Sequence, residues 1–149
     1  MNKVIVMVGI PGSGKSTWIR ENKQKDWLVI SPDTILEHRY HYEWTPERAA
    51  EAWAESFQTF GKHLLEGGTI IWDATFVSTI MRASVLHIAK GAGFIVESIF
   101  LKTNLETCLV RNKQRDRQPV PDGTIERMFE SLVPPTTEEG FDIVHTIEE

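Results

Sequence analysis

Apolar runs alternate with segments of helical period along the 149-residue chain. Five apolar runs, four of them short, predict strands, at residues 4–8, 27–31, 69–73, 94–101 and 141–147. The first is an unbroken run rich in β-branched residues, which is typical of a strand buried on both faces of a parallel sheet. Helical segments lie between the runs, beginning near Lys15 and at residues 45–66, 78–90, 103–113 and 122–132. The alternation predicts an α/β fold, with a parallel sheet of four to five strands and helices on both faces.

The longest helix has the clearest boundaries. Thr45 is suited to the N-cap and Pro46 to the first helical position, and Gly67-Gly68 ends the segment. Residues 38–44 precede it and are dense in histidine and aromatic side chains, so a loop or irregular helix is expected there. Aromatic side chains in such a stretch can stack on nucleic-acid bases, or the stretch can be a partly packed surface loop. The sequence leaves both alternatives open.

Composition fits one soluble globular domain spanning residues 1–149. The hydrophobic fraction is 41%, and Cys108 is the one cysteine, so an intramolecular disulfide is excluded. No apolar run reaches the roughly 18 residues of a membrane span, and we expect a cytoplasmic protein with no membrane partner. A net charge of −5 argues against a broad electrostatic grip on nucleic acid, although five cations cluster between residues 102 and 117.

The first strand leads into a complete phosphate-binding motif, G-x-x-x-x-G-K-[ST], at residues 9–16. Its glycines let backbone N–H groups converge on phosphates, the lysine reaches the β/γ-phosphates, and Ser16 becomes a Mg²⁺ ligand. We therefore expect a P-loop NTPase kinase fold that binds ATP and Mg²⁺. The expected nucleotide-binding residues here are Gly9, Pro11, Gly12, Ser13, Gly14, Lys15, Ser16 and Thr17.

Phosphoryl transfer also needs metal support and an oriented nucleophile, and two aspartates follow predicted strands. Asp33 follows the second strand, where it can accept the proton of an attacking hydroxyl or cap a helix. Asp73 ends the third, where it can support Mg²⁺ through water or shape a turn. The pattern alone does not rank the two carboxylates.

A basic segment supplies the third component. Residues 111–121 are polar and cationic, and we expect a lid there that brings Arg111 and Arg115 to the phosphates, with Arg115 stabilising transition-state charge. The same cations also suit a solvated helix end. Arg82, early on the helix after Asp73, either contacts acceptor or phosphate or is solvated.

Taken together, these motifs resemble the kinase domain of polynucleotide 5′-kinases, the phage and animal end-healing enzymes. The resemblance covers nearly the whole chain: residues 9–18 resemble that family's P-loop, and Asp33 falls at the position of its general base. Further resemblances are Asp73-Ala74-Thr75 with Arg82, the lid from Arg111 to Arg115 with Val120-Pro121, and Pro134-Pro135-Thr136 with Glu139-Gly140-Phe141.

The resemblance implies transfer of phosphate from ATP to a 5′-hydroxyl of DNA or RNA, with Asp73, Arg82 and Arg39 at the acceptor. Two positions depart from the family pattern. Leu36 replaces an arginine that engages the acceptor phosphate, for which Arg39 is a substitute one turn on, and Thr75 replaces an asparagine. A small-molecule kinase for a nucleoside, nucleotide or sugar is the alternative, and a non-catalytic nucleotide-binding module is a third possibility.

Overall fold

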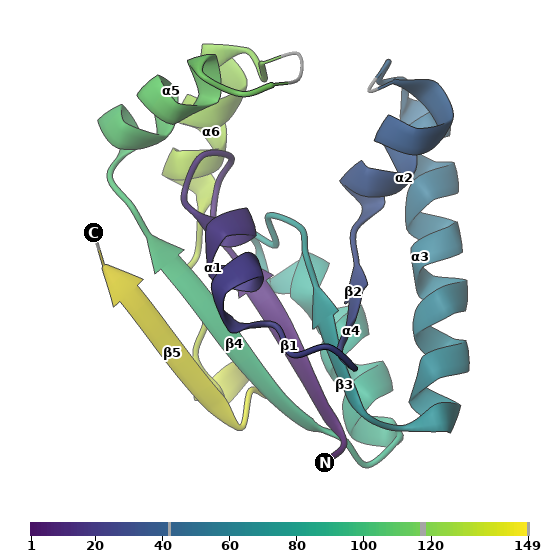
Figure 1. Ribbon diagram of the computed structural model, residues 1–149. Coiled ribbons are helices and arrows are strands. Elements are labelled where there is room, and N and C mark those ends of the chain that lie inside the picture. Colours follow the sequence, from purple (N-terminus) through teal and green to yellow (C-terminus); the bar gives the residue numbers. More distant parts are fainter. Residues whose placement is uncertain (42, 117–118, 149) are drawn as a thin grey trace.

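The computed structural model describes residues 1–41, 43–116 and 119–148. Within this part of the chain, five strands form one sheet in the order β2-β3-β1-β4-β5, and all neighbours run parallel. The strands are β1 (Lys3–Val8), β2 (Leu28–Ile30), β3 (Thr69–Trp72), β4 (Ile95–Lys102) and β5 (Ile143–Glu148) (Figure 1). The predicted parallel α/β sheet is confirmed.

Helices connect the strands and cover both faces of the sheet, as expected (Figure 1). They are α1 (Lys15–Asn22), α2 (Pro32–Tyr40), α3 (Pro46–Glu66), α4 (Thr79–Gly91), α5 (Leu105–Lys113) and α6 (Asp122–Ser131), with the short 3₁₀ helix η1 (Thr137–Glu139). Of residues 38–44, expected as a loop or irregular helix, residues 38–40 form the end of α2. The sequence did not predict the rest of this helix. That helix starts well: the Ser31 hydroxyl accepts from Thr34 N, and Pro32 occupies the first helical position.

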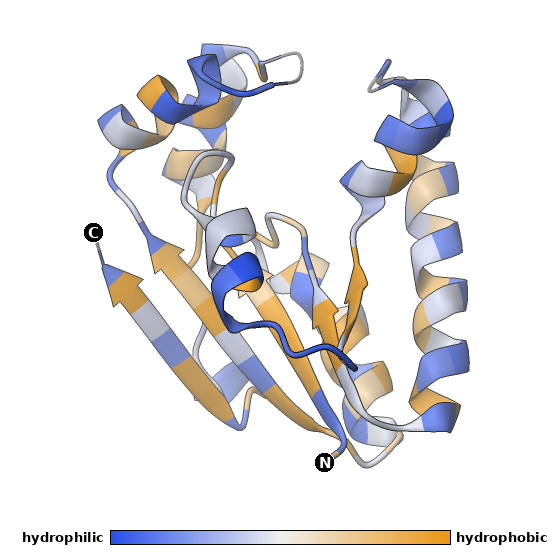
Figure 2. Cartoon of the chain, in the orientation of Figure 1, coloured by the Kyte–Doolittle hydropathy of each residue, from blue (hydrophilic) through white to orange (hydrophobic). Residues whose placement is uncertain are grey.

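Alternate residues of β1 pack on opposite faces of the sheet. Val4, Val6 and Val8 join the core beneath α3 and α4, whereas Ile5 and Met7 face α1. All five side chains are buried. Figure 2 shows the strands as predominantly apolar and the outer faces of the helices as predominantly polar.

Aromatic side chains attach α3 to the end of β3. Trp72, fully buried, lies with its ring centroid 5.7 Å from that of Trp53, 5.0 Å from Phe57 and 5.3 Å from Phe60. Contacts between aromatic rings stabilise a fold beyond the effect of the apolar area that they bury. The packing fixes the position at which the chain leaves β3, and Asp73 is the next residue.

A third apolar cluster joins α5 and α6 to the start of the phosphate loop through buried Ile10, Cys108 and Ile125. The expected lid, residues 111–121, comprises the last turn of α5 and the connection to α6. Residues 114–116 and 119–121 of this connection are not helical. In the described ranges no helix is long and apolar enough to cross a membrane.

Candidate active site

Backbone hydrogen bonds tie together the ends of three neighbouring strands. Asp73 N donates to Ile30 O at 2.8 Å, which links the ends of β3 and β2. Gly9 N donates to Thr75 O at 3.0 Å, which links the chain leaving β1 to the chain leaving β3. The phosphate loop, the loop carrying Asp73 and the start of α2 therefore share the carboxyl edge of the sheet, where open α/β sheets bind ligands.

The phosphate loop adopts a glycine-dependent conformation. Gly12 and Gly14 have φ values of 84° and 106°, which favour glycine, and α1 begins at Lys15. A Cβ atom on Gly12 would lie 2.6 Å from the carbonyl oxygen of Cys108, so the loop also needs glycine there for space.

The cationic group of the loop is folded back over it. Lys15 Nζ donates to Gly9 O at 2.8 Å and to Ile10 O at 3.1 Å. The hydroxyl-bearing Ser16 and Thr17 are exposed in the first turn of α1, beside the positive end of the helix dipole. This donor set fits an anionic phosphate chain with a hard cation.

Thr103, which follows β4, and Arg111 of α5 both bond to the backbone of the phosphate loop. The Thr103 hydroxyl donates to Ser13 O at 2.8 Å, and Arg111 Nη1 donates to Gly12 O at 3.3 Å. The structure thus brings Arg111 to the backbone of the phosphate loop, and its expected contact with the phosphates stays a prediction. Thr103 was not identified from the sequence, because it lies 90 residues from its partner.

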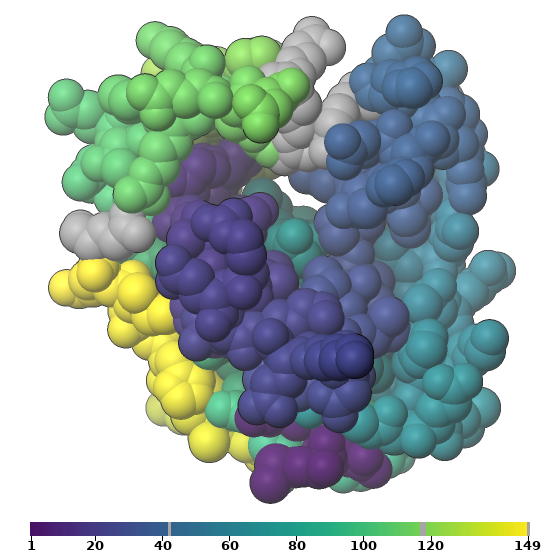
Figure 3. All heavy atoms as spheres, in the orientation of Figure 1, coloured from purple at the N-terminus to yellow at the C-terminus, as the bar shows by residue number. Residues whose placement is uncertain are grey.

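Asp33 lies across a cleft from the phosphate loop. It is exposed in the first turn of α2, and the surface is hollowed between α2 and the P-loop with α1 (Figure 3). Asp73 is partly buried directly after β3, and its backbone N–H bonds to the end of β2. The two carboxylates that the sequence left unranked therefore occupy different places: Asp33 on the far wall and Asp73 beside the loop.

Arg115 is partly buried just beyond the end of α5. Its Nη1 donates to Asn112 Oδ1 at 3.4 Å. No role for Asn112 was predicted from the sequence. Two members of the expected aromatic and basic stretches, Tyr42 and Arg117, lie outside the described residues.

Arg82 was expected either to contact the acceptor or phosphate or to be solvated, and this expectation is wrong. Its side chain is fully buried. Glu139 binds its Nε and Nη2 at 2.7 and 2.9 Å, and Nη1 donates to Phe76 O and Val133 O, each at 2.9 Å. With these bonds made, the guanidinium holds together the loop after β3 and the chain beyond α6.

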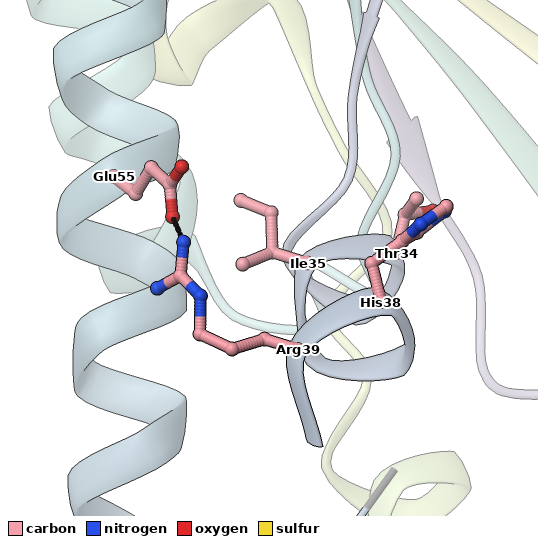
Figure 4. A pocket seen from close by; sticks show the side chains of 5 residues that line it. All are labelled: Thr34, Ile35, His38, Arg39 and Glu55. Atoms are coloured by element: carbon pink, nitrogen blue, oxygen red, sulfur yellow. Dashed lines mark hydrogen bonds and ion pairs between the residues drawn. The ribbon is translucent and has the colours of Figure 1, made fainter. Parts of the chain in front are cut away.

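Arg39 is held by two carboxylates of α3. Its guanidinium lies 2.6 Å from both Glu51 Oε1 and Glu55 Oε2. A pocket of about 390 Å³ opens beside this pair, between α2 and α3, and is lined by Thr34, Ile35, His38, Arg39 and Glu55 (Figure 4). Leu36, where an arginine was expected from the resemblance, is buried. Arg39, which was expected at the acceptor, is thus paired with two carboxylates of α3.

Known proteins share this architecture. The chain is 36% identical over 71 residues to L-seryl-tRNA(Sec) kinase from Mus musculus, a match covering 48% of this chain and 20% of that protein. It superimposes on a chain of the Pnkp1/Rnl/Hen1 RNA repair complex with a TM-score of 0.78 and 20% identity, covering 88% of this chain and 44% of the other.

A gluconokinase from Sinorhizobium meliloti 1021 is similar over 99% of this chain and 82% of its own, with a TM-score of 0.63 and 18% identity. The chain spans less than half the length of the first two proteins. At these identities the structural likeness establishes a P-loop kinase-like fold. A family profile described as an AAA domain matches residues 4–135, and the chain therefore belongs to the AAA domain family.

Proposed function

We propose that this protein is an ATP- and Mg²⁺-dependent kinase that phosphorylates a hydroxyl group, and that the hydroxyl is the 5′-OH of a nucleic acid. The carrying observation is the shared sheet edge: two backbone hydrogen bonds, Gly9 N to Thr75 O and Asp73 N to Ile30 O, tie together the ends of β1, β2 and β3. This supports a site that combines the phosphate loop with the start of α2, where Asp33 lies. A module that only binds a nucleotide has no use for a base on the far wall.

The donor side is assigned as follows. Backbone N–H groups from Gly12 to Lys15, with the Lys15 ammonium, would bind the phosphates. Ser16 would hold Mg²⁺, and Asp73 would support the ion through water. No cluster of three metal-binding side chains occurs in the described residues. A metal ion would therefore depend on the phosphates themselves for part of its ligand set. Bound Mg²⁺ would neutralise charge that develops on the transferring group.

On the acceptor side, Asp33 accepts the proton of the hydroxyl while the hydroxyl oxygen forms a bond to the γ-phosphorus. The bond between that phosphorus and the bridging oxygen breaks, so ADP leaves. Arg115 stabilises the charge on the equatorial oxygens.

A nucleic-acid acceptor is supported by the likeness to the RNA repair complex and by the match to a tRNA kinase. A small-molecule acceptor is the second candidate. It is favoured by the pairing of Arg39 with Glu51 and Glu55 and by the apolar Leu36, which leave less free positive charge on that wall.

The test is transfer of labelled γ-phosphate from ATP to a panel of DNA and RNA 5′-OH oligonucleotides, nucleosides, 3′-nucleotides and sugars. We expect label on the oligonucleotides and none on matched oligonucleotides that already carry a 5′-phosphate. Label on nucleosides or sugars alone would reject the nucleic-acid acceptor and support a small-molecule kinase. ATP binding with no labelled acceptor across the panel would reject a kinase.

A further inference from the structure

Asn112 is a fully buried amide in the last turn of α5. Burying a carboxamide is costly unless its donors and acceptor are used. The side chain meets this cost with bonds to one residue across the connection: Nδ2 donates to Val120 O at 2.6 Å, and Oδ1 accepts from Val120 N at 3.1 Å.

This pair of bonds imitates the way one strand residue bonds to its partner. It brings positions 112 and 120 side by side and so closes the connection between α5 and α6 at its base. Arg115 belongs to that connection, three residues beyond the asparagine. The position of its backbone is consequently set at both ends by one side chain.

Arg115 also contacts Asn112 directly. Its guanidinium donates to the same Oδ1 at 3.4 Å, and its backbone N donates to Asn112 O at 3.4 Å. A single carboxamide oxygen therefore serves both the closing bond from Val120 and the arginine. Since Oδ1 can accept two bonds and Nδ2 carries the donor, only an amide satisfies this set.

Helix α5 is in turn fixed to the phosphate loop. Arg111, adjacent to Asn112, donates to Gly12 O at 3.3 Å, and the backbone of Cys108 leaves no room for a side chain on Gly12. Bonded contacts thus run from the phosphate loop through the last turns of α5 to Asn112 and on to Arg115.

We propose that Asn112 is a positioning residue: its carboxamide sets where the Arg115 guanidinium stands relative to the phosphate loop. The inference rests on the proposed function, in which Arg115 acts on the transferring phosphate. Asn112 itself touches neither nucleotide nor acceptor and acts through the arginine.

A double-mutant cycle tests it, with Asn112→Asp, Arg115→Ala and the combined variant. The carboxylate keeps the acceptor oxygen, loses the donor to Val120 O and pulls the guanidinium toward itself. We expect kcat to fall about tenfold with Arg115 present, and by less than about twofold in the Arg115→Ala background, since contacting residues couple. KM for ATP should change less than kcat.

Asn104→Asp is the matched control, because it makes the same substitution at the other end of α5. Asn104 caps that helix by accepting from Thr107 N at 2.8 Å, a bond that aspartate also accepts. Its kcat should equal that of the wild type. Thermal unfolding of every variant shows whether each is folded, and Asn112→Ser replaces Asn112→Asp if the latter is not.

A loss in kcat of the same size with and without Arg115 would overturn the proposal, since a purely structural role acts independently of the arginine. If the wild type phosphorylates no acceptor, the proposed function fails instead, and the same cycle is measured on the dissociation constant for ATP. Coupling there upholds the positioning role, and additive effects reject it.

Discussion

Asp33 is the residue that we propose as the general base. It is exposed on the wall opposite the phosphate loop. Replacing it by asparagine keeps the shape and removes the base, so Asp33→Asn should lower kcat by about 10²–10⁴-fold and leave the ATP dissociation constant within about twofold. Steady-state kinetics and calorimetric titration measure the two quantities. Glu37→Gln, one turn along α2, is the control, and undiminished turnover in Asp33→Asn would exclude it as the base.

The phosphate loop has no room for a side chain at Gly12. Gly12→Ala places a Cβ 2.6 Å from the Cys108 carbonyl oxygen at a φ of 84°, so the loop must shift. ATP affinity should fall at least about tenfold, with a loss of stability of about 1–2 kcal/mol. Gly61→Ala is the matched control, because a Cβ there meets nothing within 4 Å in α3. That change should stabilise the protein by about 1 kcal/mol. Wild-type ATP affinity in Gly12→Ala would show that the loop adapts.

Single residues were predictable from sequence where their chemistry is local. The phosphate loop is contiguous, so its motif revealed Gly12 to Ser16 together. Arg82 was not predictable in this way, because its carboxylate partner is 57 residues away. Asn112 carries no motif signal of its own, since its role depends on a backbone eight residues further on.

At the scale of elements, the Arg82–Glu139 pair joins α4 to η1. Glu139→Ala would leave a fully buried guanidinium without its counter-charge, and we expect a loss of about 3–5 kcal/mol in the free energy of unfolding. Denaturant unfolding measures it. Glu138→Ala, on the exposed neighbour, should stay within about 0.5 kcal/mol of wild type. Equal stability of the two variants would mean that the pair contributes nothing.

Three strands of the sheet meet at Glu97 on β4, which lies 2.8 Å from Lys3 Nζ of β1 and 2.9 Å from His145 Nε2 of β5. Burial raises the pKa of the Glu97 carboxyl, but the hydrogen bonds from Lys3 and His145 outweigh it, and the pKa lies below the ordinary 4.5. A carboxyl with a lowered folded-state pKa stabilises the protein above its unfolded-state pKa. That contribution is lost as pH falls through the folded-state value.

Glu97→Gln should therefore lower the melting temperature at pH 7, and the difference from wild type should disappear as the pH falls below the lowered folded-state pKa. Thermal unfolding across pH measures the difference. Glu148→Gln is the control, because Glu148 of β5 forms an exposed ion pair with Lys102 of β4. Its melting temperature should differ little from that of the wild type. A difference that stays constant down to acidic pH would show that the ionised carboxylate is not the source.

Element order and type followed from the sequence because apolar runs and caps are local signals. Helix α2 was missed in part, since Pro32 follows the strand and reads as a break, whereas here it starts the helix. The strand order β2-β3-β1-β4-β5 had no sequence signal, because it is decided by the packing of α3 and α4 on one face and α1 on the other.

At the scale of the whole molecule, the protein has a net charge of −5, so the salt dependence of acceptor binding distinguishes a nucleic acid from a neutral small molecule. Single-stranded nucleic acid held at about three phosphates should bind roughly 20-fold more weakly when salt rises from about 50 to 200 mM, because counterions are released on binding. A neutral small acceptor should show almost no change. The dependence of acceptor KM on salt, measured at saturating ATP, distinguishes them, and a flat response with an oligonucleotide contradicts the nucleic-acid proposal.

Synthesis of the chain from its N-terminus imposes an order on the assembly of the site. The phosphate loop at residues 9–16 is made well before Glu139. Until then the Arg82 guanidinium lacks its counter-charge, and the loop after β3, which receives the bond from Gly9 N, lacks one of its supports. A nascent chain therefore carries a phosphate-binding motif well before it carries a finished site, and nucleotide binding should begin only after Glu139 has been made.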